Sequence, residues 1–395
     1  MLAADTSGTL REIVVCSLEA WDDVWRRNQF LVDSLLRRNS SLRVLFVEPP
    51  ADVLFDLSRR RLPARPRLRV VSDDRRLRAL RPLKALPRRL GSFSDDLLLH
   101  QVRLAVRRLG FARPTLWIND VTYAPLIRST GWPALYDITD DWLLAPFAAR
   151  ELERLRRLDK LALEQADEVV VCSEALAVSR SETRATTLIP NGVDVGHFRR
   201  PQPRPHDLPE PPVAVYVGSL HDARIDVELV EEVARALPHG NVVLVGPDSL
   251  GNRSRRRLAE TSNVVFLGAR PYRVVPAYLQ HADVVIVPHR VSPFTQSLDP
   301  IKAYECLAID TPTVATPVAG FRDHADSFSV VRAADFAGRV AEILCDPPFV
   351  SGRSVPPDWE ERALAFEGVL VRAAEQTDGT HARASGRADS STCRS

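Results

Sequence analysis

A cation and a carboxylate stand one helical turn apart in the stretch TQSLDPIKAYECLA. Residues 295–298 are predicted as a loop, Asp299 as a helix cap and Pro300 as the first helical residue. The start of a helix attracts anions because its first N–H groups are unpaired. Lys302 in the first turn suits a phosphate, and Glu305 on the same face suits a pair of sugar hydroxyls. The stretch therefore predicts a pocket for a nucleotide diphosphate.

Lys302 is unusual because nearly every other basic residue in the chain is arginine; the other lysines are Lys84 and Lys160. Lysine is a compact charge that binds phosphate without the planar fork of arginine. The alternative interpretation is that Lys302 and Glu305 form an exposed ion pair on the helix, which would contribute little to stability.

The elements around this stretch alternate between strands and helices in the second half of the chain. Apolar runs predict strands, and the segments between several of them predict helices. This alternation is typical of a doubly wound α/β domain whose strands end at a common ligand-binding edge. The predicted strands are 213–218, 241–245, 263–267, 283–287 and 312–316, with helices at 223–237, 272–281 and 299–309.

Gly218 and Ser219 follow the first strand of this second domain. A glycine at this point lets backbone N–H groups approach phosphate oxygens closely. The alternative is an ordinary turn glycine. If Gly218 and Lys302 lie at the same edge of one sheet, they can share a diphosphate.

The first half of the chain predicts another α/β domain. A strand at 12–17, a helix at 22–38 and a strand at 42–48 form a βαβ unit, which implies a parallel sheet. Further strands are predicted at 114–118, 134–138, 168–172 and 187–190, with a helix over 152–166. The resulting division is a first domain at 1–198, a proline-rich linker at 199–212, a second domain at 213–350, a helix within 351–375 and a disordered tail at 376–395.

Asp137, Asp140 and Asp141 follow the predicted strand at 134–138. Carboxylates at the carboxyl end of a strand can orient sugar hydroxyls, bind a metal or act as a base. The alternative is that they cap the helix that follows. The sequence leaves these interpretations open.

Residues 58–90 are strongly basic, with leucines between the arginines. This pattern favours contact with an anionic membrane surface or a lipid phosphate over nucleic acid, because no aromatic side chain is present for base stacking. The alternative is a solvated surface in an arginine-rich protein.

The overall composition excludes several classes of protein. The chain has 395 residues, of which 45% are hydrophobic, with a net charge of +2. Its five cysteines form no C-x-x-C pair, so neither a disulfide framework nor a zinc site is expected. No signal peptide or membrane-spanning run is found, so the cytoplasm is the expected location. The motifs of dinucleotide-binding domains, P-loops and α/β-hydrolases are also absent.

Several segments of the chain carry a family resemblance. In the second half these are VYVGSL, NVVFLGARPYRVVPAYLQHADVVIVPHR and SLDPIKAYECLAIDTPTVATPVAGF. In the first half they are WRRNQFLVDSLLRR, VLFVEPP, YDITDDW and IPNGVDVGHF. These segments resemble GT-B glycosyltransferases, and most of all the retaining, family 4-like enzymes of polysaccharide and glycolipid assembly. The resemblance implies two Rossmann-like domains facing across a cleft, with the 357–375 helix crossing back to the first domain.

The resemblance also implies a role for individual residues. Glu305 matches the carboxylate that holds the ribose hydroxyls, and Lys302 is the expected cation of the diphosphate site. The N–H groups of Ser297 and Leu298, with those near Gly218, would complete that site. Arg270 and Tyr272 match the loop where the base packs.

Three departures from the family pattern stand out. Ser297 occupies the position of the first glutamate of the family motif. The usual basic pair after the first strand of the second domain is missing, and Arg224 is the nearest substitute, so it joins Lys302 as a catalytic candidate. The glycine-rich turn after the first strand of the chain is replaced by residues 17–21, which alters the acceptor side, where Trp21 and Gln29 are further candidates.

The activity implied is transfer of a sugar from a nucleotide diphosphate sugar to a glycan or lipid-linked acceptor, with retention and without a metal or other cofactor. Catalysis would stabilise the departing diphosphate through Lys302 and the helix start. Two alternatives remain: a nucleotide-sugar epimerase of the same fold, and an inactive module that scaffolds an assembly complex, which Ser297 favours.

Overall fold

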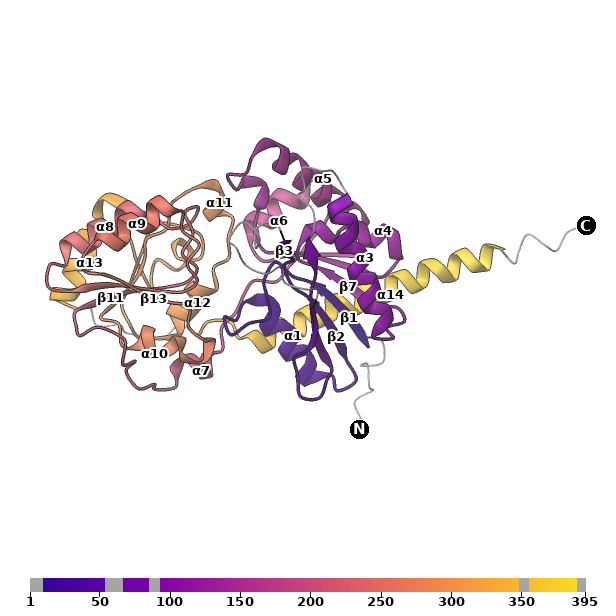
Figure 1. Ribbon diagram of the computed structural model, residues 1–395, viewed down its shortest axis with the longest axis horizontal. Helices are drawn as coiled ribbons and strands as arrows, with labels where there is room; N and C mark the ends of the chain where they lie inside the picture. The colour runs from indigo at the N-terminus through magenta and orange to yellow at the C-terminus, as the bar shows by residue number, and fades with distance from the viewer. Residues whose placement is uncertain (1–9, 54–66, 85–92, 348–354, 389–395) are drawn as a thin grey trace, which may run out of the picture.

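The computed structural model describes residues 10–53, 67–84, 93–347 and 355–388, with side chains to residue 376. Within these residues the chain forms two α/β domains that lie side by side (Figure 1), each built on a mainly parallel sheet. The predicted architecture of two doubly wound domains is therefore confirmed.

The first sheet has the strand order β10-β9-β8-β7-β1-β2-β5-β4, and every strand is parallel to its neighbour except the edge strand β4. Most of its strands are short apolar runs that are buried on both faces, as a parallel sheet covered by helices requires. Their bounds are β1 Glu12–Cys16, β2 Arg43–Val47, β4 Arg67–Val70, β5 Leu77–Arg81, β7 Thr115–Ile118, β8 Ala134–Ile138, β9 Glu168–Val171 and β10 Thr187–Leu188.

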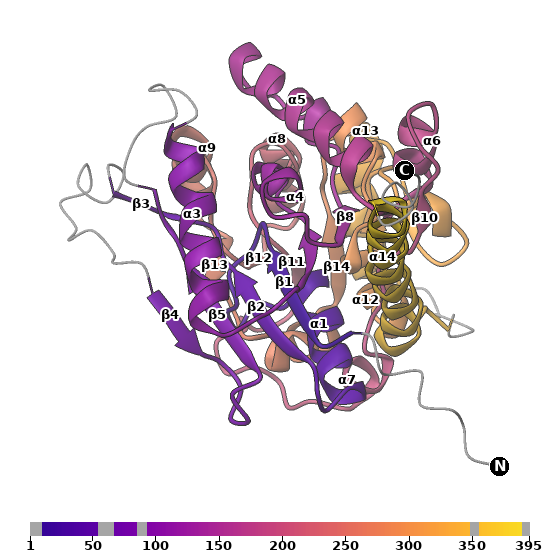
Figure 2. The ribbon, with the colours of Figure 1, turned by 90° about the vertical axis from the view of Figure 1, so that its right-hand side faces the viewer.

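Helices cover both faces of this sheet. One face packs on α3, α4 and α5, and the other on α1 and the C-terminal helix α14, which lies beside α1 (Figure 2). The helices of this domain are α1 Arg27–Arg38, α3 Phe93–Arg108, α4 Pro125–Thr130, α5 Ala149–Gln165 and α6 Glu174–Ser181. A two-stranded ladder joins β3 Ala51–Asp52 to β6 Leu83–Lys84.

The second sheet has the order β13-β12-β11-β14-β15-β16, and all of its pairs are parallel. Its strands are β11 Val213–Val217, β12 Asn241–Val245, β13 Val264–Gly268, β14 Val284–Val287, β15 Thr313–Ala315 and β16 Ser329–Val330. Its helices are α7 Val195–Arg199, α8 Val227–Ala236, α9 Asn252–Glu260, α10 Val275–Gln280, α11 Pro293–Gln296, α12 Ile301–Ala308 and α13 Ala333–Cys345.

The C-terminal helix α14, Trp359–Ala388, returns from the second domain to the first. Its aromatic residues pack on the first domain: Trp359 stacks on Phe30, with ring centres 4.7 Å apart, and Phe366 lies tilted against Trp117 at 4.5 Å. The helix continues to Ala388, so the prediction of a disordered tail from residue 376 was wrong over this range, whereas residues 389–395 lie outside the described part.

The basic stretch lies partly outside the described residues, at 58–66 and 85–90. Its described part contains strands β4, β5 and β6. Arginines alternate with apolar residues in the edge strand β4 and in β5 beside it. Several of its charges are used inside the domain: Arg69 pairs with Glu48 at 2.7 Å and Lys84 with Asp52 at 2.7 Å. None of the described helices is long and apolar enough to cross a membrane.

Candidate active site

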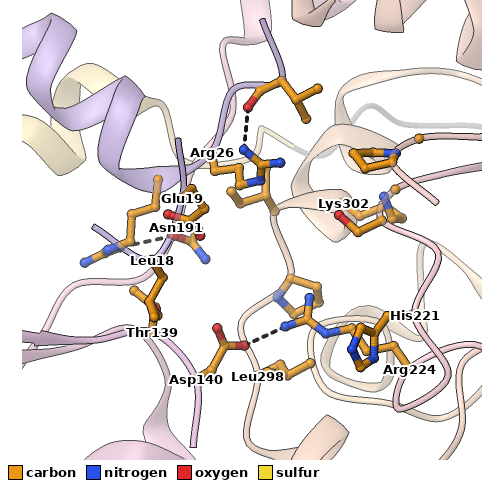
Figure 3. Close-up of a pocket in the computed structure, with 18 of the residues that line it drawn as sticks. Leu18, Glu19, Arg26, Thr139, Asp140, Asn191, His221, Arg224, Leu298 and Lys302 are labelled. Atoms are coloured by element: carbon orange, nitrogen blue, oxygen red, sulfur yellow. Dashed lines mark hydrogen bonds and ion pairs between the residues drawn. The ribbon is translucent and has the colours of Figure 1, made fainter. Parts of the chain in front are cut away.

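A cavity of about 610 Å³ lies between the two domains. Its walls come mainly from the loops that follow the strands of both sheets, which is where open α/β sheets bind ligands. Figure 3 shows the residues of this cavity from both domains. The polar residues that line it include Glu19, Arg26, Asn28, Asn119, Thr139, Asp140, Asn191, Ser219, His221, Arg224, Arg270, Tyr272, His289, Asp299, Lys302 and Glu305.

The structure brings Lys302 against Gly218, as the sequence predicts. The backbone of Gly218 has a φ of +150°, and a Cβ at this position would lie 2.5 Å from the Nζ atom of Lys302. The same Nζ atom lies 5.2 Å from the ring centre of Tyr216. Only a residue without a side chain leaves room for the lysine here, so Gly218 serves more than an ordinary turn.

Gly246 is a second glycine of this wall that the sequence analysis missed. It follows β12 as Gly218 follows β11, has a φ of +147°, and a Cβ on it would lie 2.0 Å from the carbonyl oxygen of Gly218. The two loops therefore approach each other backbone to backbone. The repeated pattern of an apolar strand followed by glycine was the available signal.

Burial shifts the pKa values of Lys302 and Glu305 in opposite directions, each toward the uncharged form. Burial lowers the pKa of Lys302, an effect that Glu305 opposes and Arg224 reinforces. Burial also raises the pKa of Glu305, and Lys302 opposes this shift. Both side chains are half-buried, and among the ion pairs of the described residues none joins them within 4.0 Å. The alternative of an exposed helix ion pair is therefore not what the structure shows.

His289 lines this wall and stays uncharged. Burial, followed by the charges of Lys302 and Arg224, lowers its pKa to about 3. Its Nε2 atom lies 3.1 Å from the hydroxyl of Tyr216. The positive charge that an incoming anion meets on this wall thus comes from Lys302 and Arg224.

Helix α12 begins at Ile301, and Asp299 does not cap it, so that detail of the prediction was wrong. Pro300 precedes the first helical residue. The Asp299 carboxylate instead accepts hydrogen bonds from the backbone N–H of Asn191 and, at 2.7 Å, from the hydroxyl of Tyr304. Asp299 therefore fixes the start of the helix against the end of the first domain.

The expected role of Ser297 is contradicted by its position. Residues 293–296 form helix α11 rather than a loop, and Ser297 ends that helix with its N–H donated to the carbonyl of Phe294 at 3.2 Å. Its hydroxyl donates to the same carbonyl at 2.8 Å. Ser297 is buried and does not line the cavity, whereas Leu298 does. The N–H of Ser297 is therefore not available to a phosphate.

Arg224 lies in the cavity and pairs across it with Asp140. The Nη2 atom of Arg224 is 2.9 Å from Oδ1 of Asp140, so the pair joins the two domains. Burial raises the pKa of Asp140, and Arg224 opposes this effect. Both residues line the cavity, and the catalytic role of Arg224 and the acceptor-side role of Asp140 stay predictions.

The two other aspartates of the cluster do not face the cavity. Asp137 is fully buried, where it pairs with Arg27 at 3.2 Å and accepts a hydrogen bond from the indole of Trp117 at 3.2 Å. Asp141 pairs with Arg180 at 3.1 Å and accepts the N–H of Leu143. Both are structural, so their expected acceptor-side role is not supported.

Trp21 and Gln29 are likewise used inside the first domain. Gln29 is buried and closes the start of α1: its side chain accepts the N–H of Arg26 at 3.0 Å and donates to the carbonyl of Asp22 at 2.9 Å. The ring of Trp21 packs edge-on against Phe46. Neither residue lines the cavity.

Arg270 and Tyr272 line the cavity, but protein partners hold both of them. Arg270 pairs with Asp207 and donates to the hydroxyl of Tyr278 at 2.9 Å. The ring of Tyr272 stacks on Trp25 of the first domain, with centres 5.8 Å apart. Both residues line the cavity, and the packing of a base against them stays a prediction.

Glu19 and Arg26 are cavity residues of the first domain that the sequence analysis did not select. The unusual loop after β1 was the available signal for Glu19. Within the described part of the chain, no group of three or more potential ligands is arranged to hold a metal ion. The expected independence of metal stays a prediction.

Residues 211–346 match the protein family described as Glycosyl transferases group 1. The chain is also 26% identical over 251 residues to the putative teichuronic acid biosynthesis glycosyltransferase TuaH of Bacillus subtilis (strain 168). That alignment covers 58% of this chain and 63% of TuaH, so less than two thirds of the relative is matched.

Solved structures share the fold over almost the whole chain. The E. coli trehalose-6-phosphate protein bound with UDP-2-fluoro glucose has a TM-score of 0.60 at 13% identity, covering 96% of this chain and 98% of that one. Anabaena HepE in complex with UDP and glucose has a TM-score of 0.58 at 16% identity, covering 94% and 99%. At such low identity these likenesses establish the fold.

The two-domain architecture, the family match of the second domain and these likenesses confirm the resemblance to GT-B fold glycosyltransferases. The match over residues 211–346 contains Gly218, Ser219, Lys302 and Glu305. The cavity between the domains is therefore the candidate active site.

Proposed function

We propose that the protein transfers a sugar from a nucleotide diphosphate sugar to a glycan or lipid-linked acceptor. The observation that carries this proposal is the contact of Lys302 with the Gly218 backbone at the edge of the second sheet, inside the interdomain cavity. A lysine charge beside an unobstructed backbone suits a diphosphate, and Glu305 one turn further along α12 suits ribose hydroxyls.

UDP is the first nucleotide to test as the donor's leaving group. E. coli and Anabaena structures with the same fold hold UDP or a UDP-sugar analogue, and this supports the choice of base. TuaH is described as acting in teichuronic acid biosynthesis, which supports a polysaccharide of the cell envelope as the product. Front-side displacement with retention is part of the proposal and rests on the family resemblance.

The chemistry proposed for Lys302 is stabilisation of the departing diphosphate. Charge builds up on the leaving oxygen in the transition state, so a fixed cation there lowers the barrier. Removing one such group typically costs about 3–4 kcal/mol, or two to three decades in rate. We therefore expect the Lys302→Ala variant to fold but to turn over slowly.

Thermal stabilisation by nucleotides tests the proposal directly. UDP at a hundred times its dissociation constant should stabilise the wild-type protein by about 2.7 kcal/mol. The Lys302→Ala variant should lose this shift. Lys160→Ala is the matched control, because Lys160 is 73% exposed on α5 and away from the cavity. A wild-type protein that no nucleoside diphosphate stabilises would contradict the proposal.

We also propose that the protein works at the inner face of the membrane, where a lipid-linked acceptor would reside. The basic stretch 58–90 supports this, although some of its described charges are paired internally. Sedimentation with vesicles of phosphatidylglycerol should retain the protein, and vesicles of phosphatidylcholine should not. Equal retention on both would contradict a charge-driven contact.

A further inference from the structure

Arg26 is a cation of the first-domain wall that the proposed donor site does not use. It stands directly before helix α1 and lines the same cavity as Lys302. In Figure 3 the side chains of Arg26 and Lys302 come from different domains. Because Lys302 and Glu305 assign the second-domain wall to the donor, Arg26 lies on the wall that is left for the acceptor.

The backbone of Arg26 is fixed, whereas one edge of its guanidinium is open. Its N–H donates to the side chain of Gln29 at 3.0 Å, and its carbonyl accepts the N–H of Phe30 at 3.2 Å. In the side chain, Nη1 donates to the carbonyl of Val24 at 2.9 Å. The Nε and Nη2 atoms donate no hydrogen bond to the described residues. These two nitrogens form the planar fork that binds a carboxylate or a phosphate through two parallel hydrogen bonds.

The other arginines of the cavity are already paired with acidic side chains. Their partners are Asp137 for Arg27, Asp140 for Arg224 and Asp207 for Arg270. The Nη1 atom of Arg26 lies 3.5 Å from Asp22, whose side chain is 46% exposed. An ion pair so open to solvent contributes little and leaves the cation available. Among the described lysines and arginines of the cavity, only Arg26 and Lys302 lack an ion pair shorter than 3.5 Å, and each belongs to a different domain.

Groups that suit sugar hydroxyls lie on the same wall as Arg26. Glu19, Asn119 and Thr139 line the cavity from the first domain. The amide of Asn119 donates to the hydroxyl of Thr139 at 3.1 Å, so both side chains are held in place. Burial raises the pKa of Glu19 to about 7, and Arg26 opposes this effect, so the carboxyl carries only part of a charge at neutral pH. An anion bound to Arg26 therefore meets no fully charged carboxylate from Glu19.

We propose that Arg26 selects an acceptor sugar that carries an anionic group, either a carboxylate or a phosphate ester. Two oxygens of that group accept hydrogen bonds from Nε and Nη2 of Arg26, and the neighbouring polar side chains contact the sugar hydroxyls. Lys302 meanwhile holds the donor diphosphate on the other wall. Arg26 is thus a specificity-determining residue. This inference rests on the proposed function and names the class of its acceptor.

Binding of small sugars to the protein saturated with a nucleoside diphosphate tests this assignment. The nucleotide, which keeps phosphate probes out of the donor site, is the one among UDP, GDP, ADP and CDP that stabilises the wild type most. The probes are neutral methyl glucoside, glucuronic acid with its carboxylate, and glucose 1-phosphate. In titration calorimetry the wild type should bind at least one anionic probe about tenfold more tightly than methyl glucoside, as hydrogen bonds to charged groups predict. The probe that gains identifies the anion as carboxylate or phosphate.

Arg26→Gln should lose this preference and keep the affinity for the nucleoside diphosphate. It should fold, because the contacts that Arg26 makes at the start of α1 use its backbone. Arg26→Lys should recover part of the preference, since lysine restores the charge without the fork. Arg156→Gln is the matched control and should behave as wild type, because Arg156 is 56% exposed on α5 and does not line the cavity.

Three results would overturn the inference. Wild type that binds no anionic probe more tightly than methyl glucoside, or a preference that persists in Arg26→Gln, would do so and leave the proposed function intact. A loss of nucleoside-diphosphate affinity in Arg26→Gln as large as in Lys302→Ala would assign Arg26 to the donor site instead. Wild type that binds no nucleoside diphosphate would overturn the proposed function, and this inference with it.

Discussion

At the scale of single residues, Gly218 decides whether Lys302 can reach the diphosphate site. A Cβ on Gly218 would meet Nζ of Lys302 at 2.5 Å, and the φ of +150° is strained for any other residue. We expect Gly218→Ala to displace the lysine, weaken UDP binding at least tenfold and cost about 1–3 kcal/mol of stability. Isothermal titration with UDP measures the first effect and denaturant unfolding the second.

Gly338→Ala is the control for that experiment. Gly338 lies inside α13, and a Cβ there would meet nothing within 4 Å. Alanine should stabilise the helix by about 0.5–1 kcal/mol and leave UDP binding unchanged. Equal UDP affinity in wild type and Gly218→Ala would show that this glycine does not make room for the lysine.

Glu19 also predicts a pH dependence of stability. Its pKa rises from 4.5 to about 7 on folding, mainly through burial, so the folded protein binds this proton more tightly than the unfolded chain does. The stabilisation of the folded state by this proton is full below about pH 4.5 and is lost as the pH rises to about 7. Glu19→Gln should therefore gain stability relative to wild type between pH 5 and pH 8. Urea unfolding at both pH values measures the difference, and an equal difference at the two would contradict the burial of this carboxyl.

At the scale of elements, the C-terminal helix α14 follows the second domain and packs on the first. Phe366 is fully buried against Trp117, with the guanidinium of Arg27 5.7 Å from its ring centre. Removing a buried phenylalanine side chain typically costs about 3–5 kcal/mol, and we expect this loss for Phe366→Ala. Leu364→Ala on the same helix is the control, since Leu364 is 55% exposed and should change stability by less than about 0.5 kcal/mol. Denaturant unfolding of both variants makes the comparison, and similar losses would show that α14 is not packed as described.

The elements also show which local features the sequence could predict. Buried parallel strands are continuous apolar runs, so β11, β12 and β14 could be placed within a residue or two, and with them the ends that carry Gly218 and Lys302. Strands β4 and β5 were missed because arginines replace part of the apolar pattern in the edge strand β4 and in β5 beside it. The predicted helix start at Asp22 was also wrong, because α1 begins at Arg27. The residue before it, Arg26, is the N-cap, and the side chain of Gln29 accepts its backbone N–H.

Long-range partners limit what the sequence can predict about the site. Asp299 and Asp137 looked like local caps or open carboxylates, but their partners Asn191 and Arg27 lie 108 and 110 residues away. A short sequence pattern cannot predict hydrogen bonds between residues so far apart in the chain. Asp140 was placed correctly in the cavity, yet its partner Arg224 belongs to the other domain. A residue that follows a strand can be assigned to the carboxyl edge of the sheet from the sequence. Whether its side chain faces the cavity or pairs with another residue depends on tertiary contacts.

At the scale of the whole molecule, hydrogen bonds hold the two domains together. The N–H of Tyr272 donates to the carbonyl of Asp23 at 2.7 Å. The hydroxyl of Ser173 donates to the carbonyl of Ser297 at 2.7 Å. The Arg224–Asp140 pair also joins the domains, and both of its residues line the cavity, so a bound ligand can change it.

The Arg224–Asp140 pair predicts competition between Asp140 and the diphosphate. The two side chains are 32% and 17% exposed, so the pair is partly screened by solvent and contributes at most about 1 kcal/mol. Asp140→Asn frees the guanidinium for the ligand, and we expect UDP to bind up to about fivefold more tightly. Arg224→Ala should weaken UDP binding, and adding Asp140→Asn to it should bring no further gain. Titration calorimetry of the two single variants and the double variant measures the coupling. A gain from Asp140→Asn that persists without Arg224 would show that Asp140 repels the diphosphate directly rather than holding its cation.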